Sequence, residues 1–511
     1  MPKSRSESGV LTGYSALAEE LKLAVPAPYT RSRIAGAVRR SEVHADHALE
    51  TYPKKQGHAG DLKAHLLFAL KYEPTDLRVL AATFKQLGPE FVRGLVRDAP
   101  TGSYARKAWF LYEYLVGQRL DLADAKTGAY TDVLDARRHI VGARRASSRH
   151  RVWDNLLGVP GFSPTVRRTR KLTGRIDQEL NKKVESLTKA VAPEILRRAI
   201  SYLYTKETKS TFEIENEHPS PQRQERFVAA LADAAKLDLS DKAALIVLQN
   251  KIVDPRYAAK DWRDFQNYVG ETAGNFREIV HLICPKPDDV PDLMQALSQA
   301  GQRVLADSVD PVIAAAILSF GFVFIHPFDD GNGRLHRFLI HSVLSKTGFS
   351  PDGVIFPISV SILRDMGAYD AALENFSKPL LGLIDWKLNE KHEFLVSGET
   401  ADHYRYFDAT PQAEYLYDRV AETIHKDLVE ELDFLSVYDR AYRAVREIVD
   451  MPNKKLSLFV RLCMQNDGRL AKSRRKAFAE LTDEEVESME AAVRSARHPR
   501  PEYEEAAEGD K

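Results

Sequence analysis

Apolar residues recur at helical spacing along most of the chain, in segments bounded by capping residues rather than by hairpin turns. The segment "ARKAWFLYEYLVGQRL" at 105–120 is an amphipathic example. The longest apolar run, "PVIAAAILSFGFVFI" at 311–325, is shorter than the roughly 20 residues that a membrane helix needs. We therefore predict a mainly α-helical protein without a membrane-spanning helix, in which 311–325 is a buried core helix.

The chain length and the breaks in this pattern predict several domains. A chain of 511 residues has room for about three or four of them. A turn at "QNDG" and a capping box at Thr482 and Glu485 mark the last helical unit. The predicted ranges are an N-terminal helical region (1–195), a helical segment (196–239), a catalytic core (240–390), a C-terminal helical region (391–498) and a disordered acidic tail (499–511).

Charge and cysteine content narrow the class of protein. The 73 basic and 73 acidic residues cancel, so net charge does not indicate a polyanion binder. The stretch 137–175 is locally basic, with Asp154 as its one acid; it could bind phosphates or an acidic partner, or form a face paired with acids elsewhere. With Cys284 and Cys463 alone, no disulfide framework is indicated. Because no secretory signal is visible either, we expect a cytoplasmic protein.

The stretch "IHPFDDGNGRLHRF" at 325–338 concentrates residues suited to phosphate chemistry. Asp, Gly and Asn tolerate the backbone conformations of a tight loop, and the apolar spacing that follows predicts a helix ending near Gly348. The first N–H groups of such a helix, at Asn332, Gly333 and Arg334, have no partner within the helix and favour an anion. The motif therefore predicts a phosphate site at a helix N-terminus.

Four side chains complete this predicted site. Arg334 and Arg337 are three residues apart and so lie on one helix face, where their guanidinium groups can hold phosphate oxygens. Asp330 is an oxygen ligand suited to Mg²⁺. His326 can be neutral at physiological pH and accept a proton from a hydroxyl. Together they indicate transfer of a phosphorus-containing group.

The sequence "HPFDDGNGRLHR" resembles the signature of the Fic (Fido) family, His-x-Phe-x-acid-Gly-Asn-Gly-Arg-x-x-Arg, at every specified position. The resemblance implies a helical Fic core with a small β-hairpin flap, flanked by helical domains, and a protein adenylyltransferase that moves AMP from ATP to a Tyr, Ser or Thr hydroxyl. It implies these roles: His326 as catalytic base, Asp330 as Mg²⁺ ligand, Gly331, Asn332 and Gly333 as anion hole, Arg334 and Arg337 as phosphate ligands, and Phe328 as a buried anchor.

A second motif lies upstream. The segment "TFEIEN" at 211–216 is similar to the family's inhibitory pattern, Ser/Thr-x-x-x-Glu-Gly/Asn. This resemblance implies that Glu215 forms a salt bridge with Arg337 and occupies the place of the ATP γ-phosphate. Taken without the resemblance, Thr and Asn here could simply cap a helix.

The flap is expected between the two motifs. The stretch 262–291 resembles the family's flap region, and its runs "NYVG" and "EIVHLIC" can pair as a hairpin to which a target protein docks. The loop "PKPDDVP" follows. Tyr369, in "GAYDAALENF", is by resemblance a candidate for the adenosine side of the nucleotide.

Other functions stay open on the sequence alone. The same site could transfer UMP, phosphocholine or another phosphate-linked group, or remove AMP. A homo-oligomer is possible. The C-terminal unit, with basic "KSRRK" at 472–476, could instead be a winged-helix-like module that binds DNA, although nothing in the sequence requires nucleic acid as a partner.

Overall fold

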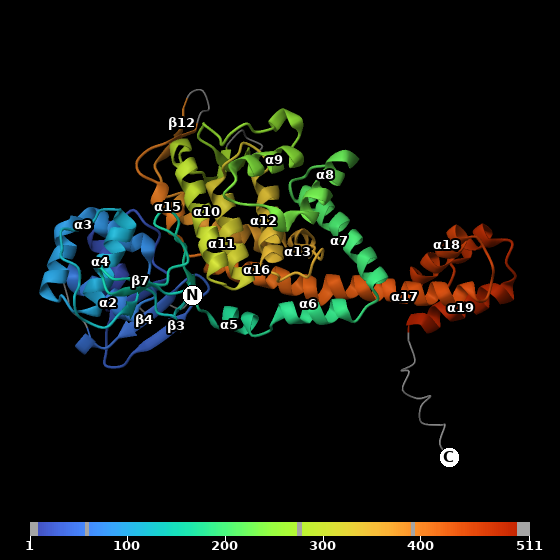
Figure 1. The fold of residues 1–511 in the computed structure, drawn as a ribbon, viewed down its shortest axis with the longest axis horizontal. Helices are drawn as coiled ribbons and strands as arrows, with labels where there is room; N and C mark the ends of the chain where they lie inside the picture. Colours follow the sequence, from blue (N-terminus) through green and yellow to red (C-terminus); the bar gives the residue numbers. More distant parts are fainter. Residues whose placement is uncertain (1–8, 57–60, 273–277, 390–393, 498–511) are drawn as a thin grey trace, which may run out of the picture. The chain divides into compact units, whose positions relative to one another are not determined.

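The protein is described here by a computed structural model, which covers residues 9–56, 61–272, 278–389 and 394–497 (Figure 1). Contacts divide the chain into two compact units. Unit 1 contains the residues up to Glu179, Glu207–Gly353 and Ile358–Ala421, and unit 2 contains Leu180–Lys206, Val354–Pro357 and the residues from Glu422 on. The predicted domain ranges stay a prediction, because these units group distant segments by contact.

The N-terminal part of unit 1 combines helices with short strands. Its helices are α1 (Gly13–Glu20), α2 (Leu62–Tyr72), α3 (Leu77–Asp98) and α4 (Ser103–Val116). A sheet in the order β1-β2-β4-β3 accompanies them, formed by β1 (Val10–Thr12), β2 (Thr30–Ile34), β3 (Arg40–Val43) and β4 (Ala48–Tyr52). The sequence predicted the helices and missed these strands. The physical reason is that β3 is exposed throughout and β2 is mostly polar, so no alternation of apolar residues marks them.

The basic stretch 137–175 is largely neutralised within unit 1. It forms the strands β6 (His139–Ile140), β7 (Arg145–Ser147), β8 (Val152–Asp154) and β9 (Val166–Arg167), and the helix α5 (Arg170–Ile176), with β5 (Thr131–Asp132) beside β8. Its cations pair with acids of other segments: Arg145 with Asp307, Arg149 with Glu113, Arg167 with Asp408, and both Lys171 and Arg175 with Asp418. These pairs favour the interpretation of a paired basic face over that of a phosphate-binding one.

The predicted catalytic core is helical, as expected. The range 240–390 contains α9 (Lys242–Ile252), α10 (Val290–Ala306), α11 (Pro311–Ile325), α12 (Asn332–Lys346), α13 (Ile358–Arg364) and α14 (Met366–Leu380). Helix α8 (Pro221–Ala232) precedes this range, and α15 (Ala401–Arg405) and α16 (Thr410–Glu422) follow it. Helix α11 is buried along almost its whole length, which confirms the predicted core helix. None of the described helices combines the length and the apolar character needed to cross a membrane.

Two hairpins lie in this part of unit 1. The predicted flap is confirmed by the antiparallel strands β10 (Tyr268–Thr272) and β11 (Glu278–Ile283); its Gly-bearing turn falls outside the described residues. The sequence missed a second hairpin, formed by β12 (Trp386–Leu388) and β13 (Phe394–Val396). The Phe394 ring stacks on Tyr268 with centroids 4.7 Å apart, so the second hairpin packs against the flap.

The stretch "PKPDDVP" is not entirely a loop. A 3₁₀ turn covers Pro287–Asp289, and α10 starts at Val290. Pro291 is tolerated because it lies in the first turn, where the missing N–H would have no partner within the helix.

Unit 2 consists of helices in its described residues. They are α6 (Leu180–Lys189), the first part of α7 (Pro193–Ile214), a π-helical segment (Thr423–Leu428), α17 (Val429–Arg446), α18 (Asn453–Met464), a 3₁₀ segment (Lys472–Phe478) and α19 (Asp483–Arg497). The capping box is confirmed, since the Glu485 N–H donates to Thr482 Oγ1 (3.2 Å) and the Thr482 N–H to Glu485 Oε2 (2.7 Å). The wing of a winged-helix module is made of β-strands. The described part of unit 2 has no strand, so it does not support the winged-helix interpretation. The tail at 499–511 lies outside the described residues.

An ion pair between Arg303 and Asp154 joins the N-terminal part of unit 1 to the core, and its contribution to stability can be measured. Arg303 donates to both oxygens of Asp154 (2.9 and 2.7 Å), and its side chain is 10% exposed. We expect Arg303→Ala to lower the stability by about 3 kcal/mol, because it leaves a poorly exposed carboxylate without its partner. Thermal unfolding measures the effect. The matched control is Arg137→Ala, whose side chain is 88% exposed and which should leave the melting temperature close to that of the unmodified protein. Equal shifts in both variants would contradict this expectation.

Candidate active site

The six residues between α11 and α12 form a tight loop that is tied to the base of the flap. His326 follows α11 with φ = 53°, in the left-handed region that non-glycine residues rarely adopt. Arg263 is buried beside the flap. Its side-chain Nε donates to the His326 carbonyl (2.8 Å), and its backbone N–H donates to the Pro327 carbonyl (2.9 Å). Its Nη2 donates to the Pro285 carbonyl (2.6 Å). The position of His326 is therefore coupled to the flap.

His326 has the geometry and charge state of a general base. Its Nδ1 lies 3.1 Å from the Val323 carbonyl oxygen, which can only accept, so Nδ1 carries the proton and the Nε2 lone pair of the neutral ring is free. Burial lowers the pKa of His326 to about 4, against smaller opposing effects of the Val323 carbonyl and Glu215. The imidazole is therefore neutral at pH 7.

The Asn332 side chain closes the loop. Its Oδ1 accepts from the Phe328 N–H (3.1 Å), and its Nδ2 donates to the Phe328 carbonyl (2.9 Å). The Phe328 ring is fully buried next to Trp262 and Phe322, which agrees with its predicted role as an anchor. Asn332 thus contributes its N–H to the predicted anion hole, while its amide side chain holds the loop.

The amide groups behind the loop are open to an anion. Among the described residues, the N–H groups of Asn332, Gly333 and Arg334 donate no hydrogen bond, as expected at the start of α12. Gly331 has φ = 89°, and a Cβ there would lie 2.7 Å from Val253. This position therefore requires glycine on both conformational and steric grounds.

Asp330 is held by one carboxylate oxygen only. Its Oδ1 accepts from the Gly331 N–H (2.6 Å) and from Arg334 Nη2 (2.7 Å). Its Oδ2 accepts no hydrogen bond from the described residues. Mg²⁺ commonly takes one or two carboxylates and completes its shell with waters and phosphate oxygens. Asp330 fits this requirement, although the described residues contain no cluster of three or more acidic, His or Cys side chains that could hold a metal by themselves.

Arg337 is fully buried and has one partner at the end of α7 and one in the turn that follows it. Its Nε donates to Thr211 Oγ1 (2.6 Å), and its Nη2 donates to Glu215 Oε1 (2.6 Å). The salt bridge that the resemblance implied is therefore present. Burial would raise the pKa of Glu215, but the charge of Arg337 outweighs this and lowers it. Arg337 Nη1 has no hydrogen-bond partner among the described residues, so a buried donor is left for a ligand.

A Schellman motif ends α7 and places the Glu215 carboxylate. The Glu217 N–H donates to the Phe212 carbonyl (3.0 Å) and the Asn216 N–H to the Glu213 carbonyl (2.9 Å), with Asn216 at φ = 55°. The Gly/Asn position of the inhibitory pattern is thus the left-handed residue of a helix end. The short pattern Thr-x-x-x-Glu-Asn combines two ligands of Arg337, one turn apart, with the turn that stops the helix.

Sequence reasoning missed Glu217. Its carboxylate accepts from Arg334 Nη1 (2.8 Å) and from Arg223 Nη2 (2.9 Å). Arg334, predicted as a phosphate ligand, is 1% exposed and lies between Glu217 and Asp330. The one signal in the sequence was the recurrence of Glu at 213, 215 and 217, which does not by itself indicate a partner.

A second polar contact missed by sequence reasoning fixes α7 against α12. The Glu207 carboxylate accepts from the N–H of Ser359 (2.8 Å) and from its hydroxyl (2.5 Å), and it lies 2.9 Å from His341 Nε2. All three residues are buried. The segment that carries Thr211 and Glu215 is therefore held against the helix that carries both arginines.

A cavity of about 460 Å³ connects these groups with the flap. Glu215, His326, Gly333 and Tyr369 line it, together with Val269 and His281 of the two flap strands. Its volume is in the range of small-molecule sites. Tyr369, the candidate for the adenosine side, is one of the residues in its wall, and its role stays a prediction. Asp330, Arg334 and Arg337 lie behind this lining, at or near the N-terminus of α12.

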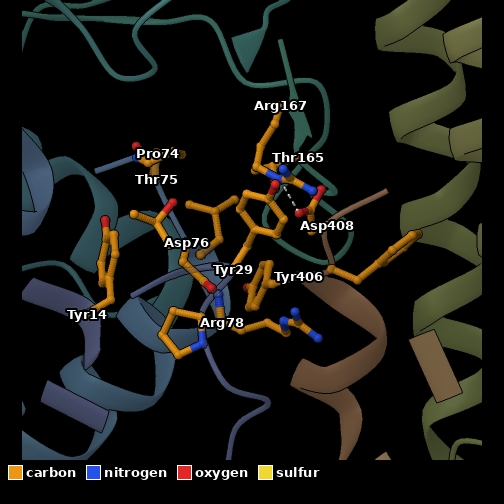
Figure 2. Close-up of a pocket in the computed structure, with 14 residues that line it drawn as sticks. Tyr14, Tyr29, Pro74, Thr75, Asp76, Arg78, Thr165, Arg167, Tyr406 and Asp408 are labelled. Carbon is orange, nitrogen blue, oxygen red and sulfur yellow. Dashed lines mark hydrogen bonds and ion pairs between the residues drawn. The ribbon is translucent and has the colours of Figure 1, made fainter. Parts of the chain in front are cut away.

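A second cavity, in the N-terminal part of unit 1, is far too small for a nucleotide. Figure 2 shows Tyr14, Asp76, Arg78 and Arg167 around it, with Arg167 paired to Asp408. Its volume is about 30 Å³, close to what one water molecule occupies. Of these two cavities, only the one at His326 can take a nucleotide.

Comparison with known proteins agrees with this geometry. Residues 239–344 match a family model described as Fic/DOC family. These residues form a Fic/DOC domain. The matched range contains the flap, the His326 loop and most of α12, while Glu215 and Glu217 precede it and Tyr369 follows it.

Three relatives of this domain carry the same name. Protein adenylyltransferase Fic of Drosophila grimshawi is 33% identical over 132 residues, which are 25% of this chain and 24% of that protein. The same-named protein of Drosophila virilis is 40% identical over 132 residues, with the same shares, and that of Nematostella vectensis is 36% identical over 83 residues, 16% of this chain and 19% of that protein. The matched stretch thus spans about a quarter of the length of the Drosophila relatives.

Two similar solved structures are also Fic proteins. A Fic family protein from Desulfovibrio desulfuricans matches with a TM-score of 0.38 and 17% identity, over 60% of this chain and 92% of that chain. A Fic-domain-containing signaling protein from Bacteroides thetaiotaomicron matches with a TM-score of 0.36 and 18% identity, over 51% of this chain and 96% of that chain.

The loop closure by Asn332 can be tested independently of activity. We expect Asn332→Asp to lower the stability of the Fic domain by about 1–3 kcal/mol, because a carboxylate cannot donate to the Phe328 carbonyl and leaves it buried without a partner. Thermal unfolding measures the shift. Asp329→Asn, an exposed change in the same loop, is the matched control and should unfold like the unmodified protein. An unchanged melting temperature for Asn332→Asp would rule out the closure as a stabilising contact.

Proposed function

We propose that this protein is an adenylyltransferase that moves AMP from ATP to a Tyr, Ser or Thr hydroxyl of a target protein. One observation carries the proposal: Gly333, at the open start of α12, and the neutral His326 line one cavity of nucleotide size. The name shared by the relatives supports the same activity. Because those relatives match only over the Fic domain, the activity of the whole chain is part of the proposal.

The reaction requires a base and an anion site close together. The target hydroxyl oxygen attacks the α-phosphorus of ATP, a new P–O bond forms, and the bond from the α-phosphorus to the bridging oxygen breaks. His326 Nε2 takes the hydroxyl proton, and pyrophosphate leaves. The N–H groups of Asn332, Gly333 and Arg334 stabilise the charge that develops on the phosphate oxygens.

The charged residues behind the lining position the phosphate chain. Arg337 Nη1 is the buried donor available to a phosphate oxygen. Asp330 Oδ2 is the carboxylate oxygen available to Mg²⁺, which when bound neutralises phosphate charge. In phosphoryl-type transfer, positioning and charge neutralisation supply most of the rate acceleration.

Glu215 inhibits the enzyme in this proposal. Its carboxylate binds Arg337 and lies so close to Gly333 that a Cβ on that residue would collide with Glu215 Oε1. The carboxylate therefore takes the place in which a phosphate would meet the same guanidinium and amide groups. ATP can adopt a productive pose only after Glu215 has moved.

The flap is the proposed docking surface for the target protein. Val269 on β10 and Ile279 on β11 are 37% and 41% exposed, which leaves apolar side chains on the hairpin for an extended target segment. Such a segment would bring its hydroxyl to His326.

The proposed inhibition by Glu215 predicts opposite effects of two substitutions. Glu215→Gly should raise AMP transfer roughly 10- to 100-fold, the factor equivalent to a charge-assisted hydrogen bond of about 1.5–3 kcal/mol. Adding His326→Ala should then lower it by roughly 10²–10⁴-fold through loss of the base. Transfer from labelled ATP, to the enzyme itself and to lysate proteins, measures both.

The control for this experiment is Glu213→Gly, the same change two residues earlier at an exposed position. The Glu213→Gly protein should transfer AMP no faster than the unmodified protein. Equal AMP transfer by the Glu215→Gly and unmodified proteins across a range of ATP concentrations would reject the proposed inhibition by Glu215. Label from UTP or CDP-choline in place of ATP would redirect the proposal to another phosphate-linked group.

The pH profile tests the base. The pKa of His326 is lowered to about 4, so its neutral form persists as pH falls and is lost only near that value. Loss of the Glu215 charge lowers this pKa further. We therefore expect kcat/KM of Glu215→Gly to stay near its plateau from pH 8 to pH ~5.5, where a histidine of ordinary pKa, ~6.5, would be mostly protonated.

Circular dichroism at each pH provides the control that the protein is folded. Half-loss of kcat/KM near pH ~6.5 in folded protein would contradict a buried, neutral base.

A further inference from the structure

We propose that Glu217 is a positioning residue for the metal-binding carboxylate Asp330, acting through Arg334. This inference rests on the proposed function, in which Asp330 holds Mg²⁺. Glu217 belongs neither to the catalytic motif nor to the inhibitory pattern.

The first observation is a chain of alternating charges. Asp330 pairs with Arg334 Nη2 (2.7 Å), Arg334 Nη1 with Glu217 (2.8 Å), and Glu217 with Arg223 Nη2 (2.9 Å). Arg223 also donates to the Ile252 carbonyl (2.7 Å), at the end of α9. The chain therefore connects the catalytic loop to two helices outside it.

The second observation is how Arg334 divides its donors. A guanidinium group can bind one carboxylate with two parallel hydrogen bonds, and such a bidentate pair occupies both carboxylate oxygens. Here the two terminal nitrogens bind two different carboxylates. With Glu217 bound at Nη1, the guanidinium group contacts Asp330 Oδ1 through Nη2 alone, and its Nε has no hydrogen-bond partner among the described residues.

This division leaves Asp330 Oδ2 available. Oδ1 already accepts two hydrogen bonds, from Arg334 and from the Gly331 N–H. Gln249 Nε2 also donates to the Asp330 carbonyl (3.1 Å), which fixes the backbone of this residue. A metal therefore meets a carboxylate that presents one oxygen from a fixed position.

Removal of the Glu217 charge should let Arg334 turn fully onto Asp330. Arg334 is 1% exposed, so its charge cannot be satisfied by bulk water and needs a carboxylate. The nearest remaining one is Asp330, and a bidentate pair would occupy Oδ2. Mg²⁺ would then have to compete with the guanidinium group for that oxygen.

The substitutions are chosen to separate charge from shape. Glu217→Gln keeps the size of the side chain but offers one acceptor oxygen to two arginines, and its amide group would face a guanidinium donor. Glu217→Ala removes the contact altogether. Both are made in Glu215→Gly protein, so that the inhibitory carboxylate does not interfere. Glu213→Gln in the same background is the matched control, because Glu213 is exposed and lies on the same segment.

The measurement is binding of α,β-methylene-ATP by titration calorimetry, in EDTA and over a series of Mg²⁺ concentrations. For both Glu217 variants we expect the Mg²⁺ concentration of half-maximal effect to rise about tenfold, the lower end of what loss of a partner behind a metal ligand costs. Affinity in EDTA should stay within about twofold of the parent. The Glu213→Gln control should match the parent in both conditions.

Three results would overturn the inference. One is an unchanged Mg²⁺ dependence in both variants. Another is an equal loss of affinity in EDTA, which would mean that Glu217 supports the whole pocket. The third is activation by Glu217→Gln alone, with Glu215 intact, to the level of Glu215→Gly, which would make Glu217 part of the inhibitory contact.

The proposed function fails in a different way. If the parent Glu215→Gly protein binds the analogue with Mg²⁺ dependence but transfers no AMP, the activity is wrong while the comparison of Glu217 variants still decides the positioning role. If the parent binds no analogue at all, both proposals are overturned.

Discussion

The burial of two arginines at the start of one helix is the constraint on which the site depends. Arg334 and Arg337 are each 1% exposed, and a guanidinium group keeps its charge under all conditions in which a protein is folded. Each must therefore meet acceptors inside the protein. Thr211, Glu215 and Glu217 supply acceptors from the end of α7 and the turn that follows it, and Asp330 supplies one from the loop before α12. The burial of both arginines therefore depends on where α7 ends.

The same constraint explains how one site can hold the Glu215 carboxylate and also be suited to bind a phosphate. Glu215 is bound by the buried guanidinium group of Arg337 and lies next to Gly333 at the open start of α12, and both of these groups also suit a phosphate. A carboxylate bound there satisfies the charge of Arg337 only in part, because Nη1 keeps no partner among the described residues. A phosphate offers more acceptor oxygens than one carboxylate. In the proposed enzyme, the exchange of one anion for another is therefore the event that separates the inhibited from the active state.

The loop between α11 and α12 gives the base its fixed position. His326 is held in a left-handed conformation by backbone contacts with Arg263, and the Asn332 amide closes the loop behind it. Such a conformation costs free energy and persists only where the surrounding contacts determine it. Since Arg263 also binds the base of the flap, the surface on which a target would dock and the imidazole that would receive its proton share one set of hydrogen bonds.

The sequence by itself determined the features that arise within a few residues of one another. The apolar run of α11, the glycine-rich loop, the open start of α12 and the capping box at Thr482 were predicted from local spacing, because each depends on backbone geometry that neighbouring residues impose. The flap was expected from resemblance to a family, and local spacing showed only that its two extended runs can pair. The pairing of Glu215 with Arg337 was available only through resemblance to a family. The tertiary structure alone decided that Glu217 lies against Arg334, that the Asn332 side chain closes the loop, that Phe394 stacks on the flap, and that the basic stretch finds its partners at Asp307 and Asp408. Apart from the contact of Asn332 with Phe328, which spans four residues, these contacts join positions separated by more than 100 residues. A charge or an aromatic ring carries no local sign of which distant group will neutralise or cover it.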